Sequence, residues 1–361
     1  MASIWGQTIK VSVFGQSHSQ AIGVTVDGLP AGIAIDRQAL AAFLERRAPG
    51  RNRFSTGRRE ADQPQFICGL VEDVTCGAPL TAIIANENTR SQDYEQIKDV
   101  PRPGHADITA QLKFGGFQDV AGGGHFSGRL TAPLCVAGGI CKQLLEKRGI
   151  EIIAKLSSIA DVCDHDFDQL SLQAEERLIA AKEIPVLDDQ CAERMLDRIE
   201  AARLAGDSVG GTISCKIHGL EAGVGAPMFD GIENRLAQAL FAIPAVKGLE
   251  FGNGFAAATL RGSENNDAFH MEEGRVTTRT NRHGGILGGI SSGLPITFRL
   301  AIKPTASIYM EQDSVSLSTG EEKRLQIKGR HDPCIAVRAV PVVEAVAAIV
   351  ICDLLAGEGK L

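Results

Sequence analysis

Two segments of the sequence, residues 133–147 and 341–355, are predicted to form helices that are apolar on nearly every side. A surface helix keeps one polar face toward water, so a helix that is apolar all round is buried on several sides. Each segment begins with a proline, which suits a first helical turn because the N–H that proline lacks has no partner there. Two such helices among many short strands predict an α+β fold, a β-α-β sandwich with buried helices between antiparallel sheets.

The sequence also contains a weak internal repeat. Three turn motifs occur twice in the same order, with offsets of 191, 216 and 209 residues: 26–33 with 217–224, 77–81 with 293–297, and 129–133 with 338–341. The first motif precedes an amphipathic helix in both copies, at 36–47 and 229–242. The similar spacing predicts two related halves with a pseudo-twofold relation. Chance matching of Gly/Pro-rich turns is the alternative that one sequence leaves open.

Composition limits the class of protein. The 361 residues are 44% hydrophobic and 22% charged, as in an ordinary globular chain, and no low-complexity linker divides them. We therefore expect one domain over 1–361, in which 188–205 forms an exposed helix and 163–187 a surface excursion. The longest apolar stretch, 340–351, contains Glu344 and is too short to span a bilayer, and no signal peptide is evident. Nine single cysteines without a Cys-x-x-Cys pair fit a reducing cytoplasm and argue against a zinc site.

Charge is unevenly distributed along the chain. The net charge of −7 and the pI near 5.7 argue against a general nucleic-acid-binding protein. Locally, however, six arginines fall within 14 residues: Arg46, Arg47, Arg51, Arg53, Arg58 and Arg59. Because the planar guanidinium group matches carboxylate and phosphate oxygens, this cluster predicts a pocket for a small, multiply anionic ligand. A solvated loop with salt bridges to Glu45 and Glu60 is an equal alternative.

Two histidines are candidates for acid–base chemistry. His18 ends the motif Gly-Gln-Ser-His, which follows a strand-like run at 9–13, so a rigid strand end would position its imidazole. His105 lies in Arg-Pro-Gly-His-Ala-Asp, a loop stiffened by prolines on both sides of Arg102. A cation beside that imidazole suits protonation of a leaving anionic group. The structural alternatives are a simple strand-end turn at His18 and, at His105, a turn histidine hydrogen-bonded to Asp107.

Glycine-rich and proline-rich loops supply further candidates. Residues 122–129, Gly-Gly-Gly-His-Phe-Ser-Gly-Arg, precede the first buried helix, where backbone N–H groups form a natural anion site. The loop matches neither the Walker pattern nor Gly-x-Gly-x-x-Gly, so nucleotide and dinucleotide sites of those types are not supported. Similar loops occur at 281–293, 303–307 and 329–333, the last with Arg-His-Asp before a proline. Close packing and ordinary turns are the alternatives.

Taken together, these stretches resemble the chorismate synthase family over nearly the whole chain. The motifs that carry the resemblance stand in the family's order: Gly-Gln-Ser-His at 15–18, Gly-Arg-Arg-Glu-Ala-Asp at 57–62, Arg-Ser-Gln-Asp-Tyr at 90–94 and Arg-His-Asp-Pro at 330–333. Each motif alone is weak, but several in the right order are specific. The resemblance implies a lyase that removes phosphate from 5-enolpyruvylshikimate 3-phosphate by 1,4-elimination, giving chorismate. Family members require reduced FMN (FMNH2) without net redox change.

The resemblance carries further expectations about partners. The substrate bears two carboxylates and one phosphate, which the arginines would neutralise. No flavin-reductase domain is visible, so we expect an external flavin reductant, with NADPH as an indirect source of electrons. We also expect a cytoplasmic homotetramer that holds no metal and binds neither nucleic acid nor membrane.

Roles for individual residues follow from the same resemblance. His18, assisted by Ser17, would protonate or hydrogen-bond the reduced flavin. His105 would be the acid that assists the departing phosphate. Asp332, together with flavin N5, would take the C6 proton, and Ser127 matches a family serine near flavin and substrate.

Binding residues are implied in the same way. Arg47 and Arg53 fall on positions assigned in the family to NADPH or to the substrate phosphate, and the phosphate is favoured because no dinucleotide fingerprint occurs. Arg129 and Arg338 would neutralise further substrate charge. The implied flavin contacts are His125, Phe126, Ser127, Ala245, Gly288, Lys303, Pro304, Thr305, Ala306, Ser307 and Arg330.

The chain departs from the commoner family pattern at several positions. Gln16 replaces a usual glutamate, Ser19 a usual glycine, and Leu130 stands where glutamate is frequent. His125 and Phe126 occupy the usual Arg-Ser positions. Because a guanidinium is always charged whereas an imidazole can be neutral at pH 7, we expect weaker or more pH-sensitive FMN binding.

Rival functions remain at this point. The chain could be a flavin-dependent lyase of another type, or a paralogue that has lost catalysis. The chain could also belong to a different class, a nucleotide-binding or RNA-binding protein that contacts its ligand through the arginine cluster. The acidic pI and the aromatic content of only 5% count against RNA recognition by stacking.

Overall fold

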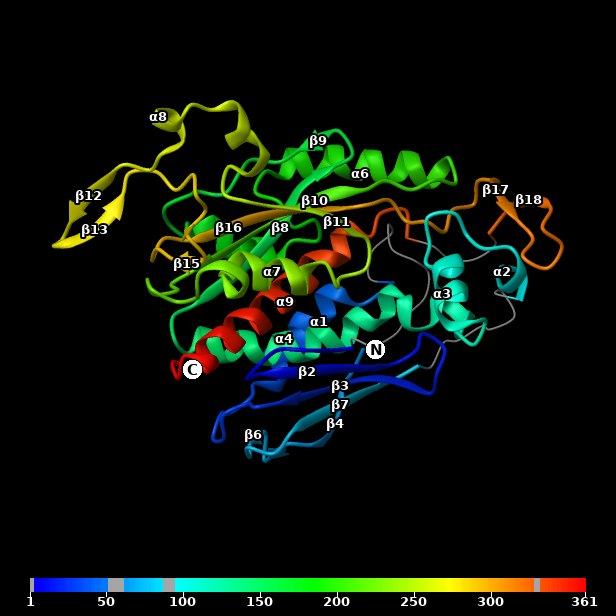
Figure 1. Ribbon diagram of the computed structural model, residues 1–361, viewed down its shortest axis with the longest axis horizontal. Helices are drawn as coiled ribbons and strands as arrows, with labels where there is room; N and C mark the ends of the chain where they lie inside the picture. The colour runs from blue at the N-terminus through cyan, green and yellow to red at the C-terminus, as the bar shows by residue number, and fades with distance from the viewer. Residues whose placement is uncertain (1–2, 51–61, 87–94, 328–331) are drawn as a thin grey trace.

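The computed structural model describes residues 3–50, 62–86, 95–327 and 332–361. Two antiparallel sheets enclose a layer of helices (Figure 1). The first sheet has the strand order β1-β2-β3-β7-β4: Ile4–Trp5, Lys10–Gly15, Ala21–Asp27, Leu80–Ala85 and Gln65–Cys68. The second has the order β11-β16-β10-β8-β9: Val246–Phe251, Ile296–Ile302, Gly211–His218, Glu151–Ile159 and Val162–Cys163. The predicted β-α-β sandwich is therefore confirmed.

The central layer consists of α1, α4, α7 and α9: Arg37–Arg47, Thr131–Glu146, Ile232–Leu240 and Ala336–Gly357. The helices α4 and α9 cross at its centre (Figure 1). Gly138 of α4 faces α9 so closely that a Cβ on it would lie 2.3 Å from Cα of Ala345. The apolar inner faces of both sheets pack onto these helices in one continuous core. Two helices that are apolar all round are thus buried on every side, as their sequences predict.

Helix α9 begins earlier than predicted. The segment 336–340 is apolar except for Arg338, and three of its five residues are buried, so it joins the helix, and Pro341 lies in the interior instead of the first turn. Proline there removes the hydrogen bond to the carbonyl four residues earlier, a cost that burial of the surrounding side chains offsets. The helix is long and apolar enough to cross a membrane, but 83% of its apolar window is buried within the fold. It is the core helix of the sandwich.

The other predicted helices are confirmed with shifted ends. Helix α1 begins one residue later than expected because Asp36 is its N-cap, accepting hydrogen bonds from the backbone N–H groups of Gln38 and Ala39 at 2.8 and 2.9 Å. Helix α7 is shorter than the predicted 229–242, because 228–230 forms a separate 3₁₀ turn.

The two halves have the same architecture. Strands β2-β3-β7-β4 in the first half correspond in order to β8-β10-β16-β11 in the second, with α1 equivalent to α7 and α4 to α9. Even single hydrogen bonds recur. The Thr75 hydroxyl donates to the carbonyl of Pro30 and accepts from the N–H of Ile33 at 2.6 and 2.9 Å, and Ser291 makes both bonds at the same distances to positions 221 and 224. The predicted repeat is a real structural duplication.

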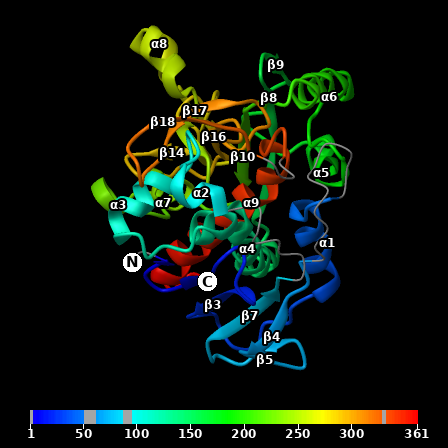
Figure 2. The same ribbon diagram turned by 90° about the vertical axis from the view of Figure 1, so that its right-hand side faces the viewer.

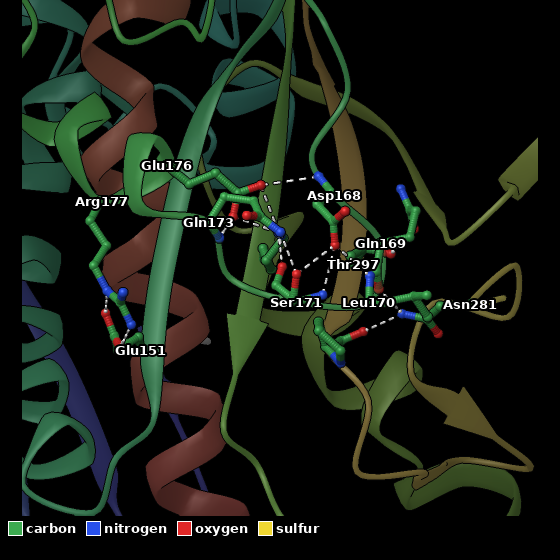
Figure 3. Close-up of polar contacts among 12 residues, drawn as sticks. Glu151, Asp168, Gln169, Leu170, Ser171, Gln173, Glu176, Arg177, Asn281 and Thr297 are labelled. Carbon is green, nitrogen blue, oxygen red and sulfur yellow. Dashed lines mark hydrogen bonds and ion pairs between the residues drawn. The ribbon is translucent and has the colours of Figure 1, made fainter. Parts of the chain in front are cut away.

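The two sheets differ on their outer faces. Residues 163–187, including α5 at Ala174–Leu178, cover the outer face of β8 and β10 (Figure 3). Two ion pairs are buried beneath this cover, Lys155 with Asp164 and Lys216 with Glu176, each at 2.7 Å. The segment was expected to be a plain surface excursion, but its carboxylates satisfy lysines that the second sheet buries. Helix α6, Asp189–Leu204, lies along β8 and β9 (Figure 2).

Smaller elements complete the fold. Helices α2 and α3, Glu95–Asp99 and Asp107–Phe114, lie near the hairpin of β17 and β18 at one end of the molecule (Figure 1). Asp99 joins them by accepting hydrogen bonds from Ser316 Oγ and the Ser318 N–H at 2.8 Å. The remaining elements are β5 Leu70–Val71, β6 Val74–Thr75, α8 Gly262–Asn265, β12 Phe269–Glu272, β13 Arg275–Thr278, β14 Ile286–Leu287, β15 Ile290–Ser291, β17 Gln312–Val315 and β18 Glu322–Leu325.

Candidate active site

A cavity of about 840 Å³ opens where the first turns of α4 and α9 meet the loops that precede them. Its wall combines the loop before α3, the glycine-rich loop, residues 241–247, the segment 303–307 and the start of α9. Both halves of the chain therefore contribute to it. The volume falls in the range of small-molecule sites.

The strand-end motif and the glycine-rich loop meet at the edge of this cavity. Ser17, almost fully buried, donates its backbone N–H to the carbonyl of Gly124 at 3.1 Å. A Cβ on Gly122 would lie 2.3 Å from the His18 ring and 2.6 Å from Ser17 Oγ, and Gly122 has a φ of +61°. Only glycine suits both conditions. Ser17 and Gly122 line the cavity, whereas His18 packs against Gly122 and is not among the lining residues.

His105 lines the cavity from the loop that leads into α3. Its Nδ1 lies 2.6 Å from Oδ1 of Asp107, and Arg102 donates to the same carboxylate through Nε and Nη2 at 2.7 Å each. Lys303 Nζ donates to the carbonyl of Gly104 at 2.7 Å. That bond ties the His105 loop to the second half of the chain.

Three of the predicted substrate-binding arginines line the cavity: Arg47 at the end of α1, Arg129 just before α4, and Arg338 in the first turn of α9. Asp62 bridges the first two, accepting one hydrogen bond from Nη1 of each. Arg338 forms an ion pair with Asp332 and donates from Nε to the Arg47 carbonyl at 3.0 Å. The three guanidinium groups are therefore held in fixed places.

The charged groups of this cluster shift one another's pKa values. Burial alone would raise the pKa of the Asp62 carboxyl, but Arg47 and Arg129 outweigh it and lower that pKa below its ordinary value. Burial lowers the pKa of the Arg338 guanidinium, and Asp332 opposes the shift. Burial also lowers the pKa of Lys303, and the neighbouring Lys247 adds to the effect. Among the described residues that line the cavity, six are lysine or arginine and one, Asp332, is a carboxylate. Asp62 and Asp107 pair with three of the arginines, so the wall stays positive, which suits an anionic ligand.

The glycine-rich loop places His125, Phe126 and Ser127 on the cavity wall. His125 Nδ1 donates to the Gly15 carbonyl at 2.8 Å, and Nε2 lies 2.9 Å from Ser3 Oγ. This side chain therefore ties the loop to the end of β2. Ser127 caps the short 3₁₀ turn before α4, where its Oγ accepts the N–H of Arg129 at 3.3 Å.

The second half supplies the opposite wall. Residues 303–307, comprising Lys303, Pro304, Thr305, Ala306 and Ser307, all line the cavity, as does Ala245. Lys303 N–H donates to the Ala245 carbonyl at 2.9 Å, and the Thr305 hydroxyl donates to the Asp332 carbonyl at 2.9 Å. Ser307 Oγ accepts from Arg102 Nη1 at 3.2 Å. Residues predicted from widely separated motifs are thus brought together.

Not every predicted residue lies in the described cavity. Gly288 sits in the turn between β14 and β15 and does not line it. Arg53 and Arg330 fall outside the described residues, as do the motif at 90–94 and His331. Among the residues that the structure describes, no group of three or more His, Cys, Asp or Glu could hold a metal ion.

Several residues in the cavity wall or directly behind it had no role assigned from the sequence. Asp62 ends the Gly-Arg-Arg-Glu-Ala-Asp motif, but its role between two arginines depends on α1 and α4 meeting in space. The hydrogen bond between His105 and Asp107, the structural alternative that the sequence offered at this loop, is present, and Arg102 donates to the same carboxylate. Lys247 and the wall residues 241–244 and 246 carry no local signal, whereas Ala245 of the same segment was predicted from the resemblance.

Comparisons with known proteins show the family to which the chain belongs. The family model described as chorismate synthase matches residues 9–356. Two curated relatives named chorismate synthase, from Lancefieldella parvula and Thermococcus gammatolerans, are each 46% identical to the chain. Their alignments cover 98% and 97% of this chain and 96% of each relative.

A solved structure supports the fold. A crystal structure of chorismate synthase superposes with a TM-score of 0.77, covering 98% of this chain and 93% of its own, at 24% identity. The matches to the family model and to the relatives extend over almost the whole sequence, including every motif quoted above. The chain belongs to the chorismate synthase family.

Proposed function

We propose that the chain catalyses the 1,4-elimination of phosphate from 5-enolpyruvylshikimate 3-phosphate to give chorismate. The C3–O bond and the C6–H bond break, a second ring double bond forms, and inorganic phosphate and a proton are released. One observation carries the proposal: in a chain of this family, the positive cavity collects His105, Asp332 and three arginines from distant motifs.

The arginines would bind the substrate anions. Arg47, Arg129 and Arg338 present guanidinium groups whose planar forks match carboxylate and phosphate oxygens. Asp62 and Asp332 hold them in place before substrate arrives, so little side-chain entropy remains to be lost on binding. Phosphate binding by Arg47 rests on this placement; Arg53, the other predicted position, lies outside the described residues.

Proton transfer would fall to three groups. His105 lines the cavity and would donate a proton to the departing phosphate. The Asp332 carboxylate would receive the C6 proton on the opposite wall, close to Arg338. His18, behind Gly122, would hold a proton for the cofactor, with Ser17 and Ser127 assisting at the cavity surface.

The cavity residues fit reduced FMN. Lys303 and the arginines supply charge for its phosphate. The glycine-rich loop comes so close to the two histidines that a side chain on Gly122 would collide with His18 and one on Gly123 would crowd His105. The contacts would come from 125–127, Ala245 and 303–307, with Gly288 and Arg330 as further proposed contacts. When bound, reduced FMN would supply an electron-rich ring that eases phosphate loss without net redox change.

The setting of the reaction is part of the same proposal. The chain would act in the cytoplasm as one domain over 1–361, supported by its continuous core and free cysteines. It would receive reduced flavin from an external reductant that draws on NADPH. Exposed Phe269, Met271 and Val276 on the projecting β12–β13 hairpin favour burial in a homotetramer.

An anaerobic phosphate-release assay tests the proposed function. The protein is mixed with 5-enolpyruvylshikimate 3-phosphate and chemically reduced FMN, and phosphate and chorismate are measured together. We expect both products in equal amounts, with reduced FMN recovered unchanged. No release, with flavin binding demonstrated in the same sample, would reject the catalytic assignment in favour of a paralogue without activity.

A further inference from the structure

Asp107 is saturated with hydrogen bonds at the start of α3. Oδ2 accepts from Nε and from the backbone N–H of Arg102 at 2.7 and 3.0 Å, and Oδ1 accepts from Nη2 of the same arginine at 2.7 Å. Both side chains are more than nine-tenths buried. Burial by itself would raise the pKa of Asp107, but Arg102 and His105 reverse the shift and hold it well below its ordinary value. The Asp107 carboxylate is therefore a fixed anion that can accept hydrogen bonds but cannot donate them.

This fixed anion determines where the proton sits on His105. Nδ1 lies 2.6 Å from Oδ1 of Asp107, so an Nδ1 without hydrogen would bring two lone pairs together at that distance. Nδ1 must therefore carry a hydrogen and donate it to Asp107. Arg102 Nη2, 3.0 Å from Nδ1, cannot accept and aims its own hydrogen at Oδ1 as well. Two donors thus converge on one carboxylate oxygen.

The other ring nitrogen of His105, Nε2, remains available to a ligand in the cavity. Among the described residues, no hydrogen bond reaches Nε2 of His105, and the residue lines the cavity. A Cβ on Gly123 would lie 3.1 Å from Nε2, so the ring is also packed on that side. With Nδ1 committed to Asp107, Nε2 is the one nitrogen that can hold and release a proton toward a ligand.

We infer that Asp107, clamped by Arg102, is a positioning residue that fixes the Nδ1–H tautomer of His105 and directs Nε2 into the cavity. In the reaction, an Nε2–H of the protonated ring would donate to the phosphate oxygen leaving C3, after which the neutral ring keeps its hydrogen on Nδ1. The role in catalysis rests on the proposed function, whereas the tautomer is a property of the resting protein. Arg102 contributes because its two side-chain hydrogen bonds to Asp107 keep that carboxylate from rotating away from His105.

The tautomer can be measured without substrate. In protein labelled with ¹⁵N-histidine at pH 8, we expect a protonated-type signal for Nδ1 of His105 and an unprotonated-type signal for Nε2, assigned by their loss in His105→Gln. In Asp107→Asn the side-chain amide can donate to Nδ1, so the hydrogen should move in part or wholly to Nε2. Asp99→Asn is the matched control, because that carboxylate accepts from Ser316 and Ser318 and does not touch His105.

Kinetics supply the second readout. In the anaerobic assay, kcat of Asp107→Asn should fall by about 10²–10⁴-fold while KM changes little, since the loss is in proton transfer and ring orientation. Arg102→Lys keeps the charge but loses the two-point grip, and a drop of roughly 10-fold is expected. Asp99→Asn should keep both the parent spectrum and the parent kcat. If Asp107→Asn fails to fold, the ¹⁵N spectra of the parent and of Arg102→Lys still show which ring nitrogen of His105 carries the hydrogen.

Two results would overturn the inference. One is a parent spectrum that shows a hydrogen on Nε2 and none on Nδ1 at pH 8. The other is an Asp107→Asn protein that folds and keeps the parent's tautomer and kcat. If the parent itself released no phosphate, the proposed function would fall, but the spectra would still decide whether Asp107 positions the ring.

Discussion

Arg129 and Arg338 occupy equivalent positions in the two halves of the chain, 209 residues apart, and both line the same cavity. Each stands at the start of one of the two central helices and each is paired with a carboxylate, Asp62 or Asp332. The duplicated architecture thus brings two copies of one motif to a single place. A pair of fixed cations on opposite helices suits a substrate with anionic groups at separate positions.

Removing the Asp62 carboxylate should unbalance this arrangement. In Asp62→Asn, two buried guanidinium groups lose their shared anion, and the free energy of unfolding should fall by about 3–5 kcal/mol. Millimolar inorganic phosphate should restore more stability to the variant than it adds to the parent, because an anion that binds the folded state stabilises it by mass action. Urea denaturation with and without phosphate measures both effects.

A surface carboxylate provides the control for that experiment. Asp161 pairs with Arg198, and both side chains are more than half exposed. Asp161→Asn should leave stability and the phosphate response unchanged. An Asp62→Asn protein as stable as the parent would contradict the view that Asp62 holds the two arginines.

Gly122 should tolerate no side chain. Its φ is +61°, and a Cβ would lie 2.3 Å from the His18 ring, so Gly122→Ala must displace His18 or the loop. Gly115 is a matched control, with a φ of +60° and nothing within 4 Å of a Cβ. Gly115→Ala should cost about 1 kcal/mol from backbone strain alone and keep activity. Gly122→Ala should lose most phosphate release, and equal activity in the two variants would show that the contact with His18 is irrelevant.

The sequence allowed the fold to be predicted better than the site. Two apolar helices and three repeated turns were enough for the sandwich and its duplication, because burial pattern and turn chemistry are local properties. Pro341 was misplaced because burial of α9 overrides the local preference of proline for a first turn. The partners of Arg47 and Lys216 could not be predicted, since each depends on which elements meet in space. The contact of His105 with Asp107 was one of the alternatives that the sequence offered, because only two residues separate them.

His125, where the resemblance to the family leads us to expect an arginine, should make FMN binding depend on pH. Nδ1 donates to Gly15, while Nε2 can accept from Ser3 Oγ when neutral or donate to it when protonated, so both charge states keep the same contacts. A histidine changes charge in the range where an arginine does not. The FMN affinity of the parent should therefore weaken from pH 6 to pH 8. His125→Arg should bind FMN more tightly than the parent, and its affinity should change little over this pH range. A dissociation constant that stays flat in both proteins would exclude this role.

Acid should weaken the contact that Glu344 makes between α1 and α9. Its buried carboxylate accepts from both terminal nitrogens of Arg46 at 2.8 Å and from the Ala154 N–H at 3.1 Å. Burial would raise the pKa of Glu344, but Arg46 and Lys142 lower it below its ordinary value of 4.5. The unfolded chain then binds the proton more readily, so this stabilisation is complete above about pH 4.5 and is lost as pH falls through the lower folded pKa. Glu344→Gln should be several kcal/mol less stable than the parent at pH 7, and the gap between their urea midpoints should narrow below pH 4.5.

The buried pair of Lys216 and Glu176 should behave differently when one partner or both are removed. Both side chains are at most 2% exposed, and the lysine Nζ contacts both carboxylate oxygens and the Ser171 carbonyl within 2.8 Å. Lys216→Met leaves a buried carboxylate unpaired and should lower the free energy of unfolding by about 3–5 kcal/mol. Lys216→Met with Glu176→Leu removes both charges and should recover most of that loss, since apolar side chains of similar volume avoid the desolvation cost. This pair lies under the segment that covers the second sheet, away from the cavity, so kcat of the double variant should equal that of the parent. A double variant that is less stable than the single variant would show that the ion pair itself stabilises the fold.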